Sequence, residues 1–144
     1  MEEEIKNCVE TLVNGGLILY PTDTVWGIGC DATNEEAVKK VYELKKRSKS
    51  KALIILISEY ANLYKLLDQV SPNAYDYMNT PKPSTIIFDN VKNISKHAIA
   101  KDGSAAIRLA NDVFCKKIID KLGQPIISTS ANISGEKNPK SFNE

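Results

Sequence analysis

The chain is 144 residues long, with 42% hydrophobic and 26% charged residues, which is typical of a single soluble globular domain with a hydrophobic core. Its formal net charge of +1 excludes a general basic field for nucleic acid, so any anion-binding site must be local. The longest apolar runs, GLILY and LIILI, are too short to cross a bilayer. The acidic N-terminus lacks the features of a signal peptide. We therefore expect a cytoplasmic protein that does not associate with a membrane.

The first part of the chain carries one helical and two strand patterns. Residues 3–13 place apolar side chains at helical spacing, and the Asn-Gly-Gly sequence at 14–16 ends that helix. Residues 17–20 predict a strand buried on both faces, which Pro21 ends. Residues 25–29 predict a second, short strand.

A second helix is expected to begin at residues 33–36, because Thr-Asn-Glu-Glu has the capping-box pattern. We expect it to reach about residue 45. Its inner face would carry four apolar side chains: Ala37, Val38, Val41 and Leu44.

The rest of the chain continues to mix strands and helices without strict alternation. We expect strands at 52–57, 84–88, 104–108 and 125–128, and helices at 60–67, from Ser71-Pro72 onward, and at 111–122. There is no internal repeat and no linker. These patterns predict an α/β fold, a single domain built on a twisted mixed sheet with flanking helices.

Histidine and cysteine usage narrows the chemistry. His97 is the only histidine, which excludes a zinc site with several His ligands and a His-rich catalytic centre. Cys8, Cys30 and Cys115 are widely spaced and form no CxxC motif, which favours reduced thiols in a reducing cytosol.

A basic segment stands between the second helix and an apolar strand. Residues 45–51 read KKRSKSK, so five of seven side chains are cationic. A polyphosphate needs such a cluster, and Arg can bind phosphate oxygens through two parallel hydrogen bonds. The alternative is a solvated loop whose cations complement the dipole at the end of a helix.

Two further segments carry small polar groups. Residues 21–27, PTDTVWG, offer two hydroxyls and a carboxylate between two strands, although ordinary turn chemistry also explains them. Residues 128–135, STSANISG, follow the last predicted strand and suit an anion or a carboxylate, although Ser-rich turns are common.

One cation ends an otherwise apolar strand. Arg108 closes the sequence AAIR at 105–108, and buried strands rarely end in an unpartnered charge. Its partner is expected to be either an internal carboxylate or an anionic substrate.

These segments, in this order, resemble the YrdC-like family of threonylcarbamoyl-AMP synthases. The resemblance rests on PTDTVWGIGCDA, KKR before an apolar strand, AAIR and STSANISG, and it covers about residues 8–139. It implies a sheet with an open, positively lined concave face. Family members continue beyond the SAN-x-SG motif, so we expect residues 1–144 to form a single YrdC-like domain that lacks the family's C-terminal segment.

The resemblance also implies an activity. Family members condense L-threonine, bicarbonate and ATP into threonylcarbamoyl-AMP and release pyrophosphate. This nucleotidyltransferase reaction serves the threonylcarbamoyladenosine modification of tRNA, so downstream tRNA threonylcarbamoyl-transfer proteins are expected partners. Mg²⁺ is expected with ATP.

Carried over residue by residue, the resemblance implies an ATP site and a threonine site. ATP would be bound by Lys45, Arg47, Lys51, Ser104 and Asn132. Threonine would be bound by Thr24, Arg108 and Ser130, with Arg108 on its carboxylate. The catalytic group would be Lys45, Arg47, Ser130 and Asn132.

Two other functions stay open. A non-catalytic RNA-binding paralogue of the same fold would bind RNA through the segment 45–51, with an affinity that falls steeply with salt. A carbamoyl-transfer domain would use carbamoyl phosphate in place of threonine.

Overall fold

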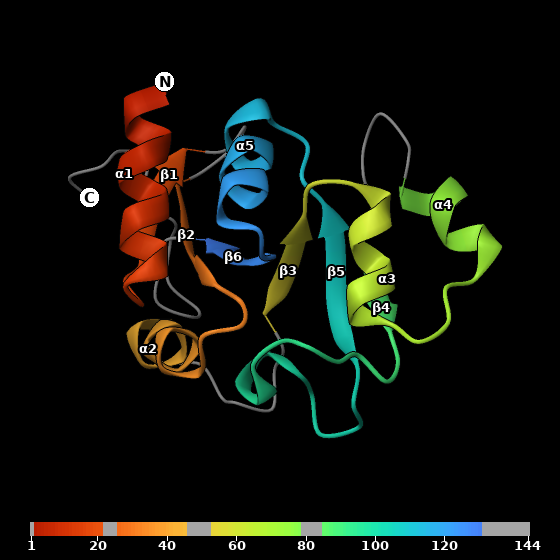
Figure 1. The fold of residues 1–144 in the computed structure, drawn as a ribbon. Coiled ribbons are helices and arrows are strands. Elements are labelled where there is room, and N and C mark those ends of the chain that lie inside the picture. The colour runs from red at the N-terminus through yellow and green to blue at the C-terminus, as the bar shows by residue number, and fades with distance from the viewer. Residues whose placement is uncertain (1, 22–25, 46–52, 79–84, 131–144) are drawn as a thin grey trace.

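The computed structural model describes residues 2–21, 26–45, 53–78 and 85–130 (Figure 1). At residues 21, 26, 45 and 130 only the backbone is described. The elements in chain order are α1 (Glu2–Val13), β1 (Ile18–Pro21), β2 (Trp26–Asp31), α2 (Glu35–Lys45), β3 (Ile54–Ile57), η1 (Tyr60–Asn62), α3 (Leu63–Leu66), α4 (Pro72–Met78), β4 (Ile86–Phe88), η2 (Lys96–Ala98), β5 (Ala105–Leu109), α5 (Val113–Leu122) and β6 (Ile126–Ser130).

The strands form one mixed sheet in the order β1-β2-β6-β3-β5-β4. Only β3 and β5 run parallel, and the other neighbouring pairs are antiparallel. In the centre, Ile54 of β3 lies opposite Ala106 of β5 on one side and Ser128 of β6 on the other. The predicted α/β class and mixed sheet are confirmed.

Helices cover both faces of the sheet. On one face, α1 and α5 lie side by side (Figure 1) and bury a cluster that includes Ile5, Leu12 and Ile118. On the other face, α2, α3 and η2 contribute to a second cluster that includes Val41 and Leu63. We call the first face the α1/α5 face.

Local sequence signals explain where the best-defined helix begins and ends. The Asp112 side chain caps α5 by accepting a hydrogen bond of 3.0 Å from the backbone N–H of Cys115. Gly123 ends the helix at φ 76°, a left-handed conformation that glycine adopts without a Cβ penalty. The predicted stop of this helix at Gly123 is confirmed.

The strands meet at two opposite ends of the sheet. At one end, β1 and β6 finish while β2, β3 and β5 begin. The register shows this, since Gly27 lies opposite both Tyr20 and Ser130. Likewise, Ile54 lies opposite both Ala106 and Ser128. We call this end the Ser130 end. At the other, β3 finishes before Ser58 and β6 begins after Pro125, and we call it the Ser58 end.

Three sequence expectations were wrong in detail. The strand at 17–20 is not buried on both faces, because Ile18 and Tyr20 are buried on one face while Leu19 on the other is exposed. Leu44 does not join the inner face of α2 and is 52% exposed, whereas Tyr42 is buried. The capping-box pattern at residues 33–36 predicted Thr33 as the cap of α2, but the cap is Asn34, whose Oδ1 accepts a hydrogen bond of 3.0 Å from the N–H of Ala37.

Candidate functional site

The elements that flank the predicted site segments meet at the Ser130 end. Ser130 is the last residue of β6, and Ser104 immediately precedes β5. Both therefore lie at the end of the sheet where β3 also begins.

Several predicted site residues lie outside the described part of the chain. These are Thr24, Arg47, Lys51 and Asn132, together with the side chains of Lys45 and Ser130. The expected convergence of Arg47 with Asn132, and the positively lined face, stay predictions.

The register places Arg108 and Ser128 on the same face of the sheet. Arg108 lies opposite Leu56, and Ser128 lies opposite Ile54; both Leu56 and Ile54 pack in the cluster under α1 and α5. Directly opposed residues share a face, and side chains alternate with a period of two. Arg108 and Ser128 thus both belong to the α1/α5 face, with Arg108 nearer the Ser58 end because Leu56 is also opposite Ile126.

Arg108 is a half-buried cation on this face. Among the described residues, no carboxylate forms an ion pair with it. Of the two partners that the sequence left open, the internal carboxylate is therefore not found within the described ranges. The guanidinium group keeps its capacity to bind a carboxylate through paired hydrogen bonds.

A buried hydroxyl pair lies on the same face of the sheet. Tyr20 of β1 is 1% exposed, and its hydroxyl donates a hydrogen bond of 2.5 Å to Oγ of Ser128 on β6. Burial raises the pKa of Tyr20 well above its ordinary value, so the phenol is neutral; the positive charge of Arg108 acts on it in the opposite direction. Sequence reasoning missed this pair.

Two glycines in β2 make room for the Tyr20 ring. A Cβ at Gly27 would stand 3.0 Å from Cε2 and Cζ of Tyr20, and one at Gly29 would stand 3.0 Å from Cε1. The alternation Gly-Ile-Gly at 27–29 is the one sequence signal that could have indicated an aromatic ring lying across this strand.

Ser104 already has a partner within the protein. Its hydroxyl donates a hydrogen bond of 2.6 Å to Oδ1 of Asp102, which also accepts from the Ser104 N–H at 3.0 Å. These bonds lower the pKa of Asp102. The turn fixes the start of β5, and the Ser104 oxygen can still accept a hydrogen bond.

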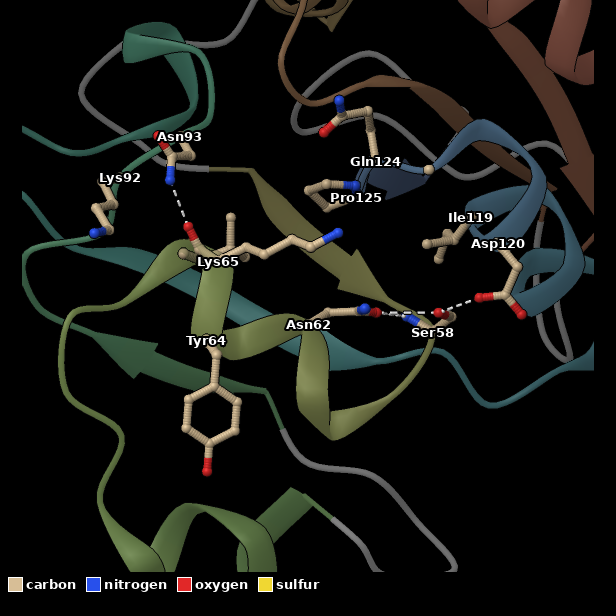
Figure 2. Close-up of a pocket in the computed structure, with 12 residues that line it drawn as sticks. Ser58, Asn62, Tyr64, Lys65, Lys92, Asn93, Ile119, Asp120, Gln124 and Pro125 are labelled. Atoms are coloured by element: carbon tan, nitrogen blue, oxygen red, sulfur yellow. Dashed lines mark hydrogen bonds between the residues drawn. The ribbon is translucent and has the colours of Figure 1, made fainter.

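A pocket of about 470 Å³ lies at the opposite, Ser58 end (Figure 2). The Ser58 hydroxyl donates a 2.5 Å hydrogen bond to Asp120, and Asn62 Oδ1 accepts from the backbone N–H of Ser58 at 3.0 Å. Lys65 extends its side chain across the pocket (Figure 2). Of the predicted site residues that are described, none lines this pocket.

The described ranges contain neither a metal-ligand cluster nor a membrane-spanning helix. Within these ranges, no cluster of three or more His, Cys, Asp or Glu side chains has the arrangement of a metal site. None of the helices found there has the length and apolar character needed to span a bilayer.

Comparisons with known proteins show the family of the chain. A family model for Sua5, YciO and YrdC proteins, described as "Telomere recombination", matches residues 10–144. A protein of Saccharophagus degradans named threonylcarbamoyl-AMP synthase is 36% identical over 140 residues, which cover 96% of this chain and 73% of that protein. A protein of the same name from Pseudoalteromonas translucida is 31% identical and covers 99% of this chain and 79% of its own length.

A solved structure supports the same relationship. P. abyssi Sua5 complexed with L-threonine superimposes with a TM-score of 0.86 at 28% sequence identity. The match covers 99% of this chain and 43% of the Sua5 chain, so this chain spans less than half the length of that protein.

Proposed function

The chain belongs to the Sua5/YciO/YrdC family, and on this premise we propose that it is a threonylcarbamoyl-AMP synthase. Its relatives carry that name, and the Sua5 protein of P. abyssi binds L-threonine. The observation that carries the proposal is Arg108, a half-buried cation without an ion pair among the described residues, on the same face as Ser128. A substrate carboxylate is the partner that this cation fits best.

In the proposed reaction, the amine of threonine attacks the carbon of bicarbonate, water leaves, and a carbamate forms. A carbamate oxygen then attacks the α-phosphorus of ATP, and pyrophosphate leaves with its bonding electron pair. No nucleophilic side chain is required. The protein has to hold three anionic groups together, and positioning alone can lower such a barrier by about 7–11 kcal/mol.

Threonine is proposed to lie against the α1/α5 face, between Arg108, which the register places opposite Leu56, and the end of β6. Arg108 would bind its carboxylate, and Thr24 and Ser130 would orient its amine and hydroxyl. The Tyr20–Ser128 pair on the same face is neutral, so it adds no negative charge that would compete for the guanidinium group.

ATP is proposed to approach from the segment that follows α2. Lys45, Arg47 and Lys51 would neutralise charge on the phosphates, while Ser104 and Asn132 would hold the nucleotide. Lys45, Arg47, Asn132 and Ser130 remain the proposed catalytic group. Mg²⁺ is expected to accompany ATP, since phosphates and water supply most of its ligands.

A reducing cytoplasm is proposed as the compartment, supported by the free thiols of Cys8, Cys30 and Cys115. Contact with RNA and with tRNA threonylcarbamoyl-transfer proteins belongs to the same proposal, since a threonylcarbamoyl adenylate is an activated intermediate that a transferase must consume.

The direct test is pyrophosphate release from ATP and bicarbonate with and without L-threonine. The proposal predicts threonine-dependent release. If ATP binds but threonine causes no release, the synthase proposal fails. RNA affinity that falls steeply with salt and needs no threonine would then favour the RNA-binding alternative, and release that depends on carbamoyl phosphate would favour carbamoyl transfer.

A further inference from the structure

The hydroxyl of Tyr20 makes a connection that strand pairing alone does not make. In the sheet, β1 and β6 are separated by β2, yet Tyr20 on β1 bonds directly to Ser128 on β6 at 2.5 Å. Its ring lies across Gly27 and Gly29 of the intervening strand. One side chain therefore ties three strands together on the α1/α5 face.

This connection lies near the ends of β1 and β6, just before the segments that contain the proposed threonine ligands Thr24 and Ser130. Ser128 is two residues before Ser130, and Gly27 lies opposite both Tyr20 and Ser130. Tyr20 also immediately precedes Pro21, the last residue of β1 before the segment that contains Thr24. Arg108 lies on the same face but nearer the other end of the sheet, because it is opposite Leu56, which is opposite Ile126 at the start of β6.

We propose that Tyr20 is a positioning residue for the threonine site: its hydrogen bond to Ser128 holds the ends of β1 and β6 in the spacing that substrate binding requires. This inference rests on the proposed function and adds a residue that acts through others. Tyr20 and Ser128 are both buried, so the pair influences the ligand through the strand ends and not by contact. Small displacements of positioned groups weaken binding and catalysis strongly.

The competing explanation is that the bond only stabilises the fold. The Ser58 end offers a matched control, because Ser58 is also 8% exposed and also makes a 2.5 Å side-chain hydrogen bond, to Asp120. Ser128→Ala and Ser58→Ala thus remove the same atom from equally buried serines at opposite ends of one sheet.

The test measures L-threonine affinity by calorimetry with ATP present, KM and kcat for threonine-dependent pyrophosphate release, and the urea midpoint of unfolding. We expect Tyr20→Phe and Ser128→Ala each to raise Kd and KM for threonine about five- to tenfold, as expected for the loss of one buried hydrogen bond. Ser58→Ala should lower the urea midpoint and leave both threonine constants unchanged. The double variant should lose no more threonine affinity than either single variant, because both substitutions remove the same bond.

Three results would overturn the inference. One is an unchanged threonine Kd and KM in Tyr20→Phe, another is an equal change in Ser58→Ala, and the third is additive losses in the double variant. If Tyr20→Phe does not fold, Ser128→Ala decides alone by the same criteria. If the unmodified chain neither binds threonine nor releases pyrophosphate, the proposed function is wrong as well. If the unmodified chain is active and Tyr20→Phe leaves the threonine Kd and KM unchanged, only this inference is wrong.

Discussion

The pocket beside Ser58 and the α1/α5 face use similar polar groups to different effect. Around the pocket, Ser58 bonds to Asn62 and to Asp120, and Lys92 forms an ion pair with Asp68. On the α1/α5 face, Ser128 bonds to a neutral phenol, and Arg108 has no ion pair within the described ranges. The polar groups around the pocket largely satisfy one another, whereas the α1/α5 face leaves a cation available to a ligand.

The largest effect expected from this difference is on threonine binding. Arg108→Gln should weaken threonine binding about 10- to 100-fold, because hydrogen bonds to charged groups contribute about 1.5–3 kcal/mol. ATP binding should change much less. Lys65→Gln, which removes a cation from the Ser58-end pocket, should leave both affinities unchanged in calorimetry. Equal losses for threonine and ATP in Arg108→Gln would refute the assignment of this residue.

The next effect concerns the nucleotide. Lys45→Ala should weaken ATP binding about tenfold, since one charge-assisted contact to phosphate is removed, and should affect threonine less. Lys40→Ala is the matched control, because Lys40 is an exposed cation on the same helix. If both variants bind ATP equally well, the phosphate role of Lys45 is wrong.

Two glycine substitutions, at Gly27 and at Gly123, should lower the stability of the fold for different physical reasons. Gly27→Ala should reduce the free energy of unfolding by about 1–3 kcal/mol, since its Cβ would press on the Tyr20 ring, and should also weaken threonine binding. Gly123→Ala should cost about 1–2 kcal/mol through left-handed strain at φ 76° alone and leave threonine binding intact. Urea unfolding and calorimetry on both variants would separate strain from loss of the site, and a Gly27→Ala protein of full stability would contradict the ring placement.

The smallest expected effect is on stability at alkaline pH. Burial raises the pKa of Cys30 to about 12 and raises those of Cys115 and Tyr20. Groups with raised pKa values contribute stability below their ordinary pKa that is lost as pH rises, because the unfolded chain releases protons that the folded chain retains. The free energy of unfolding should therefore decline from about pH 9 upward.

Tyr20→Phe should remove the tyrosine part of this decline, which amounts to less than about 1 kcal/mol at pH 10.5. Ser58→Ala should leave the pH dependence as it is. Urea unfolding of the three proteins between pH 8 and 10.5 measures the difference, and an identical slope in Tyr20→Phe would show that the phenol ionises freely in the folded state.

Periodicity and capping signals were sufficient for most of the fold. The helix expected over 111–122 and its Gly123 stop rest on local signals, and the structure has α5 ending at Gly123 as predicted, with Asp112 as an N-cap that the sequence analysis did not name. Burial was harder to predict: Leu19 and Leu44 are exposed because periodicity defines a face but does not say whether another element covers it. Similarly, the sequence could not show that β1 would be an edge strand, since strand order depends on contacts far apart in the chain.

The candidate site was predictable to the extent that single residues were chemically unusual. Arg108 stood out as a cation at the end of an apolar strand, and the structure leaves it without an ion pair among the described residues. The Tyr20–Ser128 bond joins residues 108 positions apart. It depends on β2 lying between the two strands and on the glycines of β2, which leave room for the Tyr20 ring to reach across. Neither condition can be read from Tyr20 or Ser128 alone.

The most direct measurement is a crystal structure of the protein with ATP and L-threonine. We predict the threonine carboxylate on Arg108 at the α1/α5 face, with no ligand in the pocket beside Ser58. Threonine bound among Ser58, Lys65 and Gln124 instead, with Arg108 left empty, would contradict the account.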